Sequence, residues 1–178
     1  MSFATKEVIV VPYDPKWTDQ YQIVNAMVEP ILKPWLITIE HVGSTSVLGL
    51  AAKPVIDVDC VIDRADFKQA LLALEQNGFA NRGDLGIPDR YAIAGPLLPF
   101  RYHLYLTFPD AQSFREHVAL RDWLRTHESD RDAYAALKTS LALVHRFDID
   151  AYIEGKSALI DRILIQAGVR PEKNSINQ

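Results

Sequence analysis

The sequence predicts an α/β (α+β) protein in which a small mixed sheet, flanked by helices, is followed by a C-terminal helical lobe. Strand-like runs of alternating or β-branched residues occur only in residues 1–110 of the 178-residue chain. After Phe108 the apolar residues instead recur every three or four positions, a pattern typical of helices. The strands are too few for a full doubly wound sheet. We expect a core over residues 1–110, a helical lobe over 111–170 and a flexible tail over 171–178.

The individual elements follow from residue type and spacing. Strands are predicted where β-branched or alternating residues dominate, at 6–11, 36–42, 54–62, 91–94 and 102–108. Helices are predicted where apolar residues keep a helical period, at 15–32, 66–77, 112–125, 129–145 and 150–167. Asp14 and Pro15 suit the start of the first helix, and Gly78 suits the end of the second. Residues 44–52 are expected to form one or two helical turns, and residues 81–88 a loop.

Composition narrows the class of protein. A net charge of −4 argues against sequence-independent nucleic-acid binding. The single cysteine, Cys60, excludes an internal disulfide and a cysteine zinc cage. No apolar run reaches the ~18 residues that span a bilayer, and the first residues lack the long apolar core of a signal peptide. We therefore expect a cytoplasmic protein without a membrane partner.

Two aspartates interrupt the otherwise apolar strand at residues 54–62. Because side chains alternate along a strand, Asp57 and Asp59 share one face while Val58 and Cys60 point to the other. Two carboxylates ~4 Å apart repel by about 4 kcal/mol at an effective dielectric near 20. A cation between them removes that cost, and carboxylate oxygens suit Mg²⁺ or Mn²⁺ shared with substrate phosphates. The pair predicts a metal site with a catalytic role.

A glycine-serine turn precedes this strand. Gly43 permits a tight turn and a close backbone approach to a ligand. The amides around Ser44, Thr45 and Ser46 begin a short helical segment and can hold a phosphate oxygen. A strand, a glycine-serine turn and a second strand with Asp-x-Asp form the arrangement of the nucleotidyltransferase fold.

The motifs as a set resemble the GrpB family, over roughly residues 8–167. The resemblance rests on HVGSTS at 41–46, KP at 53–54, GDLGIP at 83–88, HLY at 103–105 and YIEGK at 152–156. It implies a nucleotidyltransferase-like fold, since the family is similar to that superfamily. In some bacteria the family's domain is joined to dephospho-CoA kinase. The resemblance names no substrate.

The chain departs from the superfamily pattern at its third acid. The strand expected to carry that carboxylate, RYHLYLT at residues 101–107, has none. His103 is the candidate replacement, because a histidine beside the aspartates can act as a general base. The alternatives are that Asp84 reaches in from its loop, or that the protein binds nucleotide without transferring it.

Several charged residues are expected to hold phosphate. They are Lys53, Asp84, Arg90, Arg101 and Lys156. Gly155, Lys156 and Ser157 do not form a phosphate-binding loop, because Asp150 stands where that pattern requires glycine. Four basic residues, His117, Arg121, Arg125 and His127, are expected on a solvated helix face or in salt bridges between helices.

Two functions remain open. In the first, the protein is a metal-dependent nucleotidyltransferase in which Asp57, Asp59 and His103 act on a nucleoside triphosphate and an unknown small acceptor. In the second, it is a non-catalytic module that binds a nucleotide or a coenzyme-like phosphate beside a partner enzyme. The missing third acid favours the second function, and the retained aspartate pair favours the first.

Overall fold

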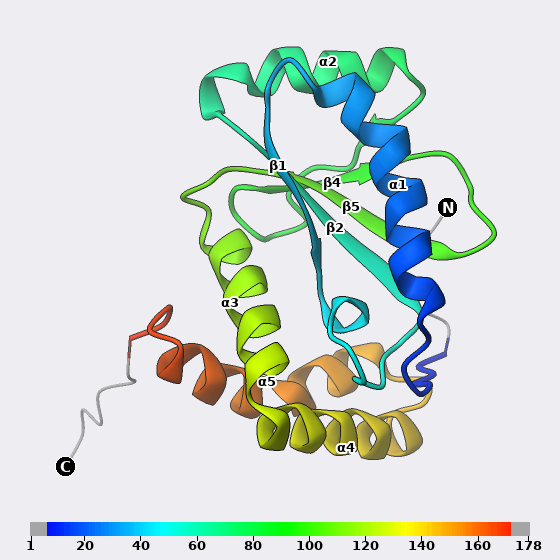
Figure 1. Ribbon diagram of the computed structural model, residues 1–178, viewed down its shortest axis with the longest axis vertical. Coiled ribbons are helices and arrows are strands. Elements are labelled where there is room, and N and C mark those ends of the chain that lie inside the picture. The colour runs from blue at the N-terminus through cyan, green and yellow to red at the C-terminus, as the bar shows by residue number, and fades with distance from the viewer. Residues whose placement is uncertain (1–6, 172–178) are drawn as a thin grey trace.

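A computed structural model describes residues 7–171 of the chain (Figure 1). In chain order the helices are α1 Lys16–Leu32, α2 Phe67–Gln76, α3 Gln112–Thr126, α4 Glu128–Val144 and α5 Ile149–Gln166. The strands are β1 Leu36–Val42, β2 Val55–Ile62, β3 Ala80–Asn81, β4 Arg90–Ala94 and β5 Arg101–Thr107. Short 3-10 turns lie at Ser44–Ser46 and Arg64–Asp66. The predicted fold class, a mixed sheet flanked by helices and followed by a helical lobe, is confirmed.

The five strands form one sheet in the order β1-β2-β5-β4-β3. The central strands β2 and β5 are parallel, and the other neighbouring pairs are antiparallel. The register of β2 and β5 sets His103 beside Asp57 and Tyr105 beside Asp59. The strand without a carboxylate therefore lies next to the strand that carries two.

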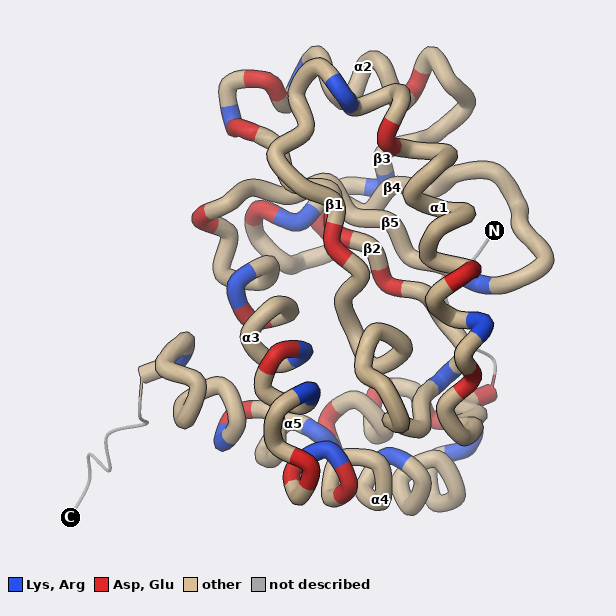
Figure 2. Tube along the Cα trace, viewed as in Figure 1, with Lys and Arg blue, Asp and Glu red and all other residues tan. Residues whose placement is uncertain are grey.

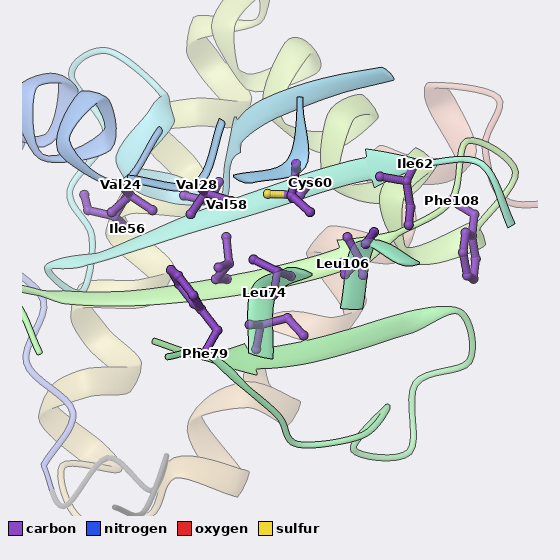
Figure 3. Close-up of a cluster of buried hydrophobic side chains, with 14 of the residues drawn as sticks. Val24, Val28, Ile56, Val58, Cys60, Ile62, Leu74, Phe79, Leu106 and Phe108 are labelled. Carbon is purple, nitrogen blue, oxygen red and sulfur yellow. The ribbon is translucent and has the colours of Figure 1, made fainter. Parts of the chain in front are cut away.

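One face of the sheet is buried beneath α1 and α2. Alternate residues of β2 pack there against both helices, and Figure 3 shows them with Leu106 of β5. The members on β2 are Ile56, Val58, Cys60 and Ile62. Because β2 alternates, Asp57 and Asp59 face the opposite side of the sheet. Burial raises the pKa of the Cys60 thiol, which suits a structural residue.

The helical lobe closes over the connection between β1 and β2. Val47 and Leu50 of that connection pack with Leu124, Tyr134 and Ile163 from the three lobe helices. Figure 1 shows α3 descending from the sheet to α4 and α5, which lie at one end of it. Acidic positions occur on β1 and β2, and the surrounding helices carry both basic and acidic positions (Figure 2). None of the helices between residues 7 and 171 is long and apolar enough to cross a membrane.

Three predicted elements need correction. The described part of the predicted strand at 6–11 is not a strand, and only Val11 pairs, with Ala52, in an isolated bridge; Lys6 lies outside the described residues. The helical turn after Gly43 is shorter than predicted and ends at Ser46, because Gly49 and Pro54 favour non-helical backbone. Strand β3 was expected to be loop, and its two residues are too short to show a periodic pattern. The predicted tail at 171–178 is described only at Pro171.

Candidate functional site

Each aspartate of β2 is hydrogen-bonded to a histidine. His103 Nδ1 lies 2.9 Å from Asp57 Oδ1, and His117 Nδ1 lies 2.8 Å from Asp59 Oδ2. The Asp57 side chain is 29% exposed and that of Asp59 is 1% exposed, so only Asp57 opens to solvent. The cluster joins β2 to its neighbour β5 and to helix α3.

The histidines offset the charge of the carboxylates. Burial acts to raise the pKa of Asp57, but the hydrogen bond and charge of His103, with the charges of His117 and Lys53, hold that pKa below its usual value. Burial likewise acts to lower the pKa of His117, but its hydrogen bond to Asp59, together with the negative charges of Asp59 and Asp57, overcomes that effect and raises the pKa. An ionised carboxylate can only accept a hydrogen bond, so Nδ1 of His103 donates to Asp57.

Gly43 brings the turn against Asp57. Its φ of 71° lies in the left-handed region, and a Cβ atom placed there would stand 2.4 Å from Asp57 Oδ2. The turn is held by the Thr45 hydroxyl, which donates to the Val55 carbonyl, and by the Ser46 hydroxyl, which donates to the Gly43 carbonyl. These two hydroxyls are used within the turn, and so is the Ser46 amide, which donates to the Gly43 carbonyl. Among the described hydrogen bonds none uses the amides of Ser44 and Thr45, which are the candidates for a ligand contact.

Replacement of Gly43 by alanine should weaken nucleotide binding at least tenfold, because the methyl group would displace the Asp57 carboxylate. Gly49→Ala is the matched control. Gly49 has a similar φ of 78°, but its Cβ would meet nothing nearer than the Arg131 guanidinium at 3.9 Å. Both variants carry the cost of a left-handed alanine. Equal nucleotide affinities of the two variants in a calorimetric titration would show that the close packing of Gly43 on Asp57 affects stability and not nucleotide binding.

Three lysines converge beside the turn. Buried Lys138 of α4, 2% exposed, donates to Ser44 Oγ at 2.8 Å and to the Ala51 carbonyl at 2.5 Å. Lys53 and Lys156 place their ammonium groups 5.6 and 4.5 Å from the centre of the Tyr152 ring. No carboxylate is among the described contacts of Lys138. Lys53 and Lys156 were predicted phosphate ligands, whereas Lys138 was not predicted from the sequence.

Burial shifts the pKa values of these lysines. It lowers the pKa of Lys138 to about 7, with a contribution from the charge of Lys156. It lowers the pKa of Lys156 to about 8, where Lys53 acts in the same direction and Asp57 opposes. Burial also lowers the pKa of Lys53, again against the attraction of Asp57. A bound phosphate would supply these buried ammonium groups with a negatively charged hydrogen-bond partner.

Lys138→Met should change how stability depends on pH. The unfolded chain binds a proton at a lysine up to pH ~10.4, whereas folded Lys138 releases it near pH 7. The unfolded state therefore binds more protons in this window, and the free energy of unfolding rises with pH. Denaturant titrations between pH ~7 and ~9 should show a smaller rise for Lys138→Met than for the wild type. The control is Lys68→Met, which removes an exposed lysine on α2 and should keep the wild-type dependence of unfolding free energy on pH. If Lys138→Met also keeps that dependence, the buried amine of Lys138 is fully protonated in the folded protein and the prediction is wrong.

Helix α3 contributes more than the solvated face that was expected. His117 contacts Asp59, and Arg121 donates to Glu40 Oε2 and to the His41 carbonyl. Arg125 donates to the Ser46 carbonyl at 2.8 Å. The expectation was wrong for His117 and Arg121, because their side chains turn toward β2 and β1. Arg125 and His127 are exposed as expected, and His127 stacks on Trp123.

The remaining predicted phosphate ligands differ in position. The Arg90 guanidinium lies 4.4 Å from the Tyr105 ring centre, and its buried Nε has no described partner. Arg101 is exposed at the start of β5, and its charge acts on Lys53. Asp84 is exposed, accepts the Gly86 amide and has no described contact with Asp57 or Asp59, so the structure does not bring it to the site as a third acid.

The aspartate pair fits a divalent cation that is shared with a ligand. Asp59 Oδ1 is buried without a hydrogen-bond partner, and no described hydrogen bond engages Asp57 Oδ2. Two carboxylate oxygens suit Mg²⁺ or Mn²⁺ when phosphates and waters complete the coordination. Between residues 7 and 171 no three His, Cys, Asp or Glu side chains are grouped so as to hold a metal ion by themselves. The site therefore fits a substrate-bridged cation and not a cage made only of protein.

Comparison with known proteins gives one consistent family. The family model described as GrpB protein matches residues 7–166. UPF0157 protein BH1888 from Halalkalibacterium halodurans is 32% identical over 90% of this chain and 82% of its own length. UPF0157 protein YqkA from Bacillus subtilis is 28% identical over 89% of this chain, which spans only 46% of that protein.

Solved structures agree with this assignment. The crystal structure of conserved protein GrpB from Enterococcus faecalis matches with a TM-score of 0.78 at 31% identity, over 89% of this chain and 96% of that one. A weaker likeness, with a TM-score of 0.47 at 16% identity, is to the poly(U) polymerase Cid1 in complex with its short product ApU. The likeness to Cid1 covers 41% of that protein and carries no conclusion about activity.

Proposed function

The chain belongs to the GrpB family, and from the geometry of its site we propose that it transfers a nucleotidyl group from a Mg²⁺-bound nucleoside triphosphate to a small acceptor. The observation that carries the proposal is the close approach of Gly43 to Asp57 beside three converging lysines. A phosphate chain needs a backbone turn that it can reach, carboxylates for its metal and cations for its charge. These groups meet at one end of β2.

Each group has a part in binding. Lys138 donates to Ser44 Oγ and so brings its ammonium group to the turn where a phosphate would lie. Lys53 and Lys156, held against Tyr152, offset the charge farther along the phosphate chain. Asp57 Oδ2 and Asp59 Oδ1 would hold Mg²⁺, which when bound polarises the phosphate oxygens.

The transfer step balances without any further reactant. An acceptor hydroxyl oxygen attacks the α-phosphorus and forms a new P–O bond. The bond from that phosphorus to the bridging oxygen breaks, and pyrophosphate leaves with the electron pair. His103 takes the proton of the attacking hydroxyl on Nε2, because its Nδ1 is hydrogen-bonded to Asp57. Pyrophosphate departs beside Lys53 and Lys156.

A direct test is transfer of label. The protein, Mg²⁺ and each of the four nucleoside triphosphates labelled at the α-phosphate are incubated with panels of small acceptors. We expect labelled product with at least one pair and release of pyrophosphate, both lost in Asp57→Asn. Asp63→Asn, an exposed acid just after β2, is the matched control and should retain activity. Product formation that persists in Asp57→Asn would contradict the proposed site.

One observation favours the second candidate function, binding without transfer. The positions of β5 beside the aspartates hold His103 and Tyr105, and no described residue supplies a third acid there. A binding module would retain micromolar nucleotide affinity, Mg²⁺ dependence and sensitivity to Gly43→Ala. It would give no labelled product with any acceptor, and this outcome separates it from the enzyme.

A further inference from the structure

A cavity of about 510 Å³ lies beside the connection between β4 and β5. It is lined by residues 93–103 and by Arg82. Its size falls within the ~300–1,000 Å³ of small-molecule sites. The cavity is distinct from the small space of about 60 Å³ between the Gly43 turn and the helical lobe, and none of the three lysines lines it.

The walls of the cavity are mostly apolar and fixed in shape. Ile93, Leu97, Leu98 and Phe100 line it together with Pro96 and Pro99. The Tyr102 hydroxyl donates to the Pro96 carbonyl at 2.8 Å and ties the connection to β5. A Cβ at Gly95 would stand 2.4 Å from that hydroxyl oxygen and 2.5 Å from the Phe79 ring, so the backbone is closely packed there. Two prolines and this packing form the cavity before any ligand binds.

The charged groups of the cavity are all basic. Arg82 and Arg101 contribute guanidinium groups, and none of the residues that line the cavity is Asp or Glu. His103 also lines it, and the same histidine contacts Asp57 at 2.9 Å. His103 therefore belongs both to the wall of this apolar, cationic cavity and to the proposed reaction centre.

We propose that this cavity binds the acceptor, and that the acceptor is a small organic anion with an apolar body and a carboxylate or phosphate group. The apolar body lies against Leu97 and Leu98, and the anionic group meets Arg82. A hydroxyl at the other end of the molecule faces His103. The role as acceptor rests on the proposed function, whereas binding of such an anion does not.

Binding can be measured without nucleotide. The probe is 3-phenylpropionate, followed by ligand-detected NMR and titrated to obtain its affinity, with 3-phenyl-1-propanol as the uncharged counterpart. We expect the acid to bind at least tenfold more tightly than the alcohol. Equal binding of both compounds, or no binding of the acid, would overturn the proposal.

Two variants locate the probe. Leu97→Asp adds a negative charge to the cavity wall and should weaken binding of the acid at least tenfold. Leu97 is 79% exposed, so the variant should fold, and Leu143→Asp, equally exposed on α4, is the matched control with expected wild-type affinity. Arg82→Gln should reduce affinity for the acid while leaving that for the alcohol unchanged. Equal losses of affinity for the acid in Leu97→Asp and Leu143→Asp would show that the probe binds outside the cavity.

Adding a nucleotide distinguishes a cavity that binds the acceptor from one that binds the nucleotide. We expect a non-hydrolysable nucleoside triphosphate with Mg²⁺ to bind together with 3-phenylpropionate. Competition between them would assign the cavity to the nucleotide and overturn the acceptor role. If the probe binds in the cavity but no labelled transfer occurs with any acceptor, the anion site stands and the proposed transferase function fails.

Discussion

Replacement of both Asp57 and Asp59 by asparagine is expected to abolish the stabilisation of the protein by Mn²⁺ or Mg²⁺. The wild type should gain about 1.4 kcal/mol at a metal concentration ~10 times the dissociation constant, which for a chain of this size is roughly 3–6 °C in melting temperature. Asparagine keeps a hydrogen-bond acceptor for each histidine but lacks the negative charge that a hard cation requires.

The measurement compares melting with and without metal for each protein separately. This matters because the metal-free variant should already melt at a lower temperature, since the charge of His117 loses its partner Asp59. Asp63→Asn combined with Asp66→Asn removes the same net charge from neighbouring positions, and neither carboxylate caps a helix. This control should respond to metal like the wild type. A metal response that survives in Asp57→Asn/Asp59→Asn would refute the metal assignment.

His103→Ala should lower the turnover of nucleotidyl transfer on the order of 10²-fold or more, within the range of a positioned acid-base group. Nucleotide affinity should barely change, because the phosphate chain is assigned to the turn and the lysines. His127→Ala, an exposed histidine of the α3–α4 junction, should keep full turnover. A parallel loss of turnover and affinity in His103→Ala would indicate that the residue only supports Asp57, and unchanged turnover would exclude it as the base.

The fold was largely predictable because its elements have clear periods. The strand at Leu36–Val42 was predicted with its observed bounds, and β2 was predicted to within one residue. The common face of Asp57 and Asp59 followed from alternation alone. Strand β3 was missed because its two residues carry no period, and its pairing with β4 depends on contacts distant in sequence.

The site was only partly predictable, because part of it comes from the lobe. Lys138 was missed, and His117 was placed on a solvated helix face, since a polar residue in a helix is usually exposed. A signal was nevertheless present for Lys138, because Tyr134, Lys138 and Ala142 recur at four-residue steps on the buried stripe of α4. A lysine in the middle of an apolar stripe predicts a buried amine with a specific partner, and here the partner is Ser44.

The most direct test of the central claim is calorimetric titration with α,β-methylene nucleoside triphosphates, with and without Mg²⁺. We expect saturable binding of at least one nucleotide to the wild type, weakened at least tenfold when Mg²⁺ is removed and at least tenfold in Asp57→Asn. Asp63→Asn should bind like the wild type. Absence of binding to the wild type for every nucleotide, or binding that neither Mg²⁺ nor Asp57 affects, would contradict the assignment of this site to a metal-bound nucleotide.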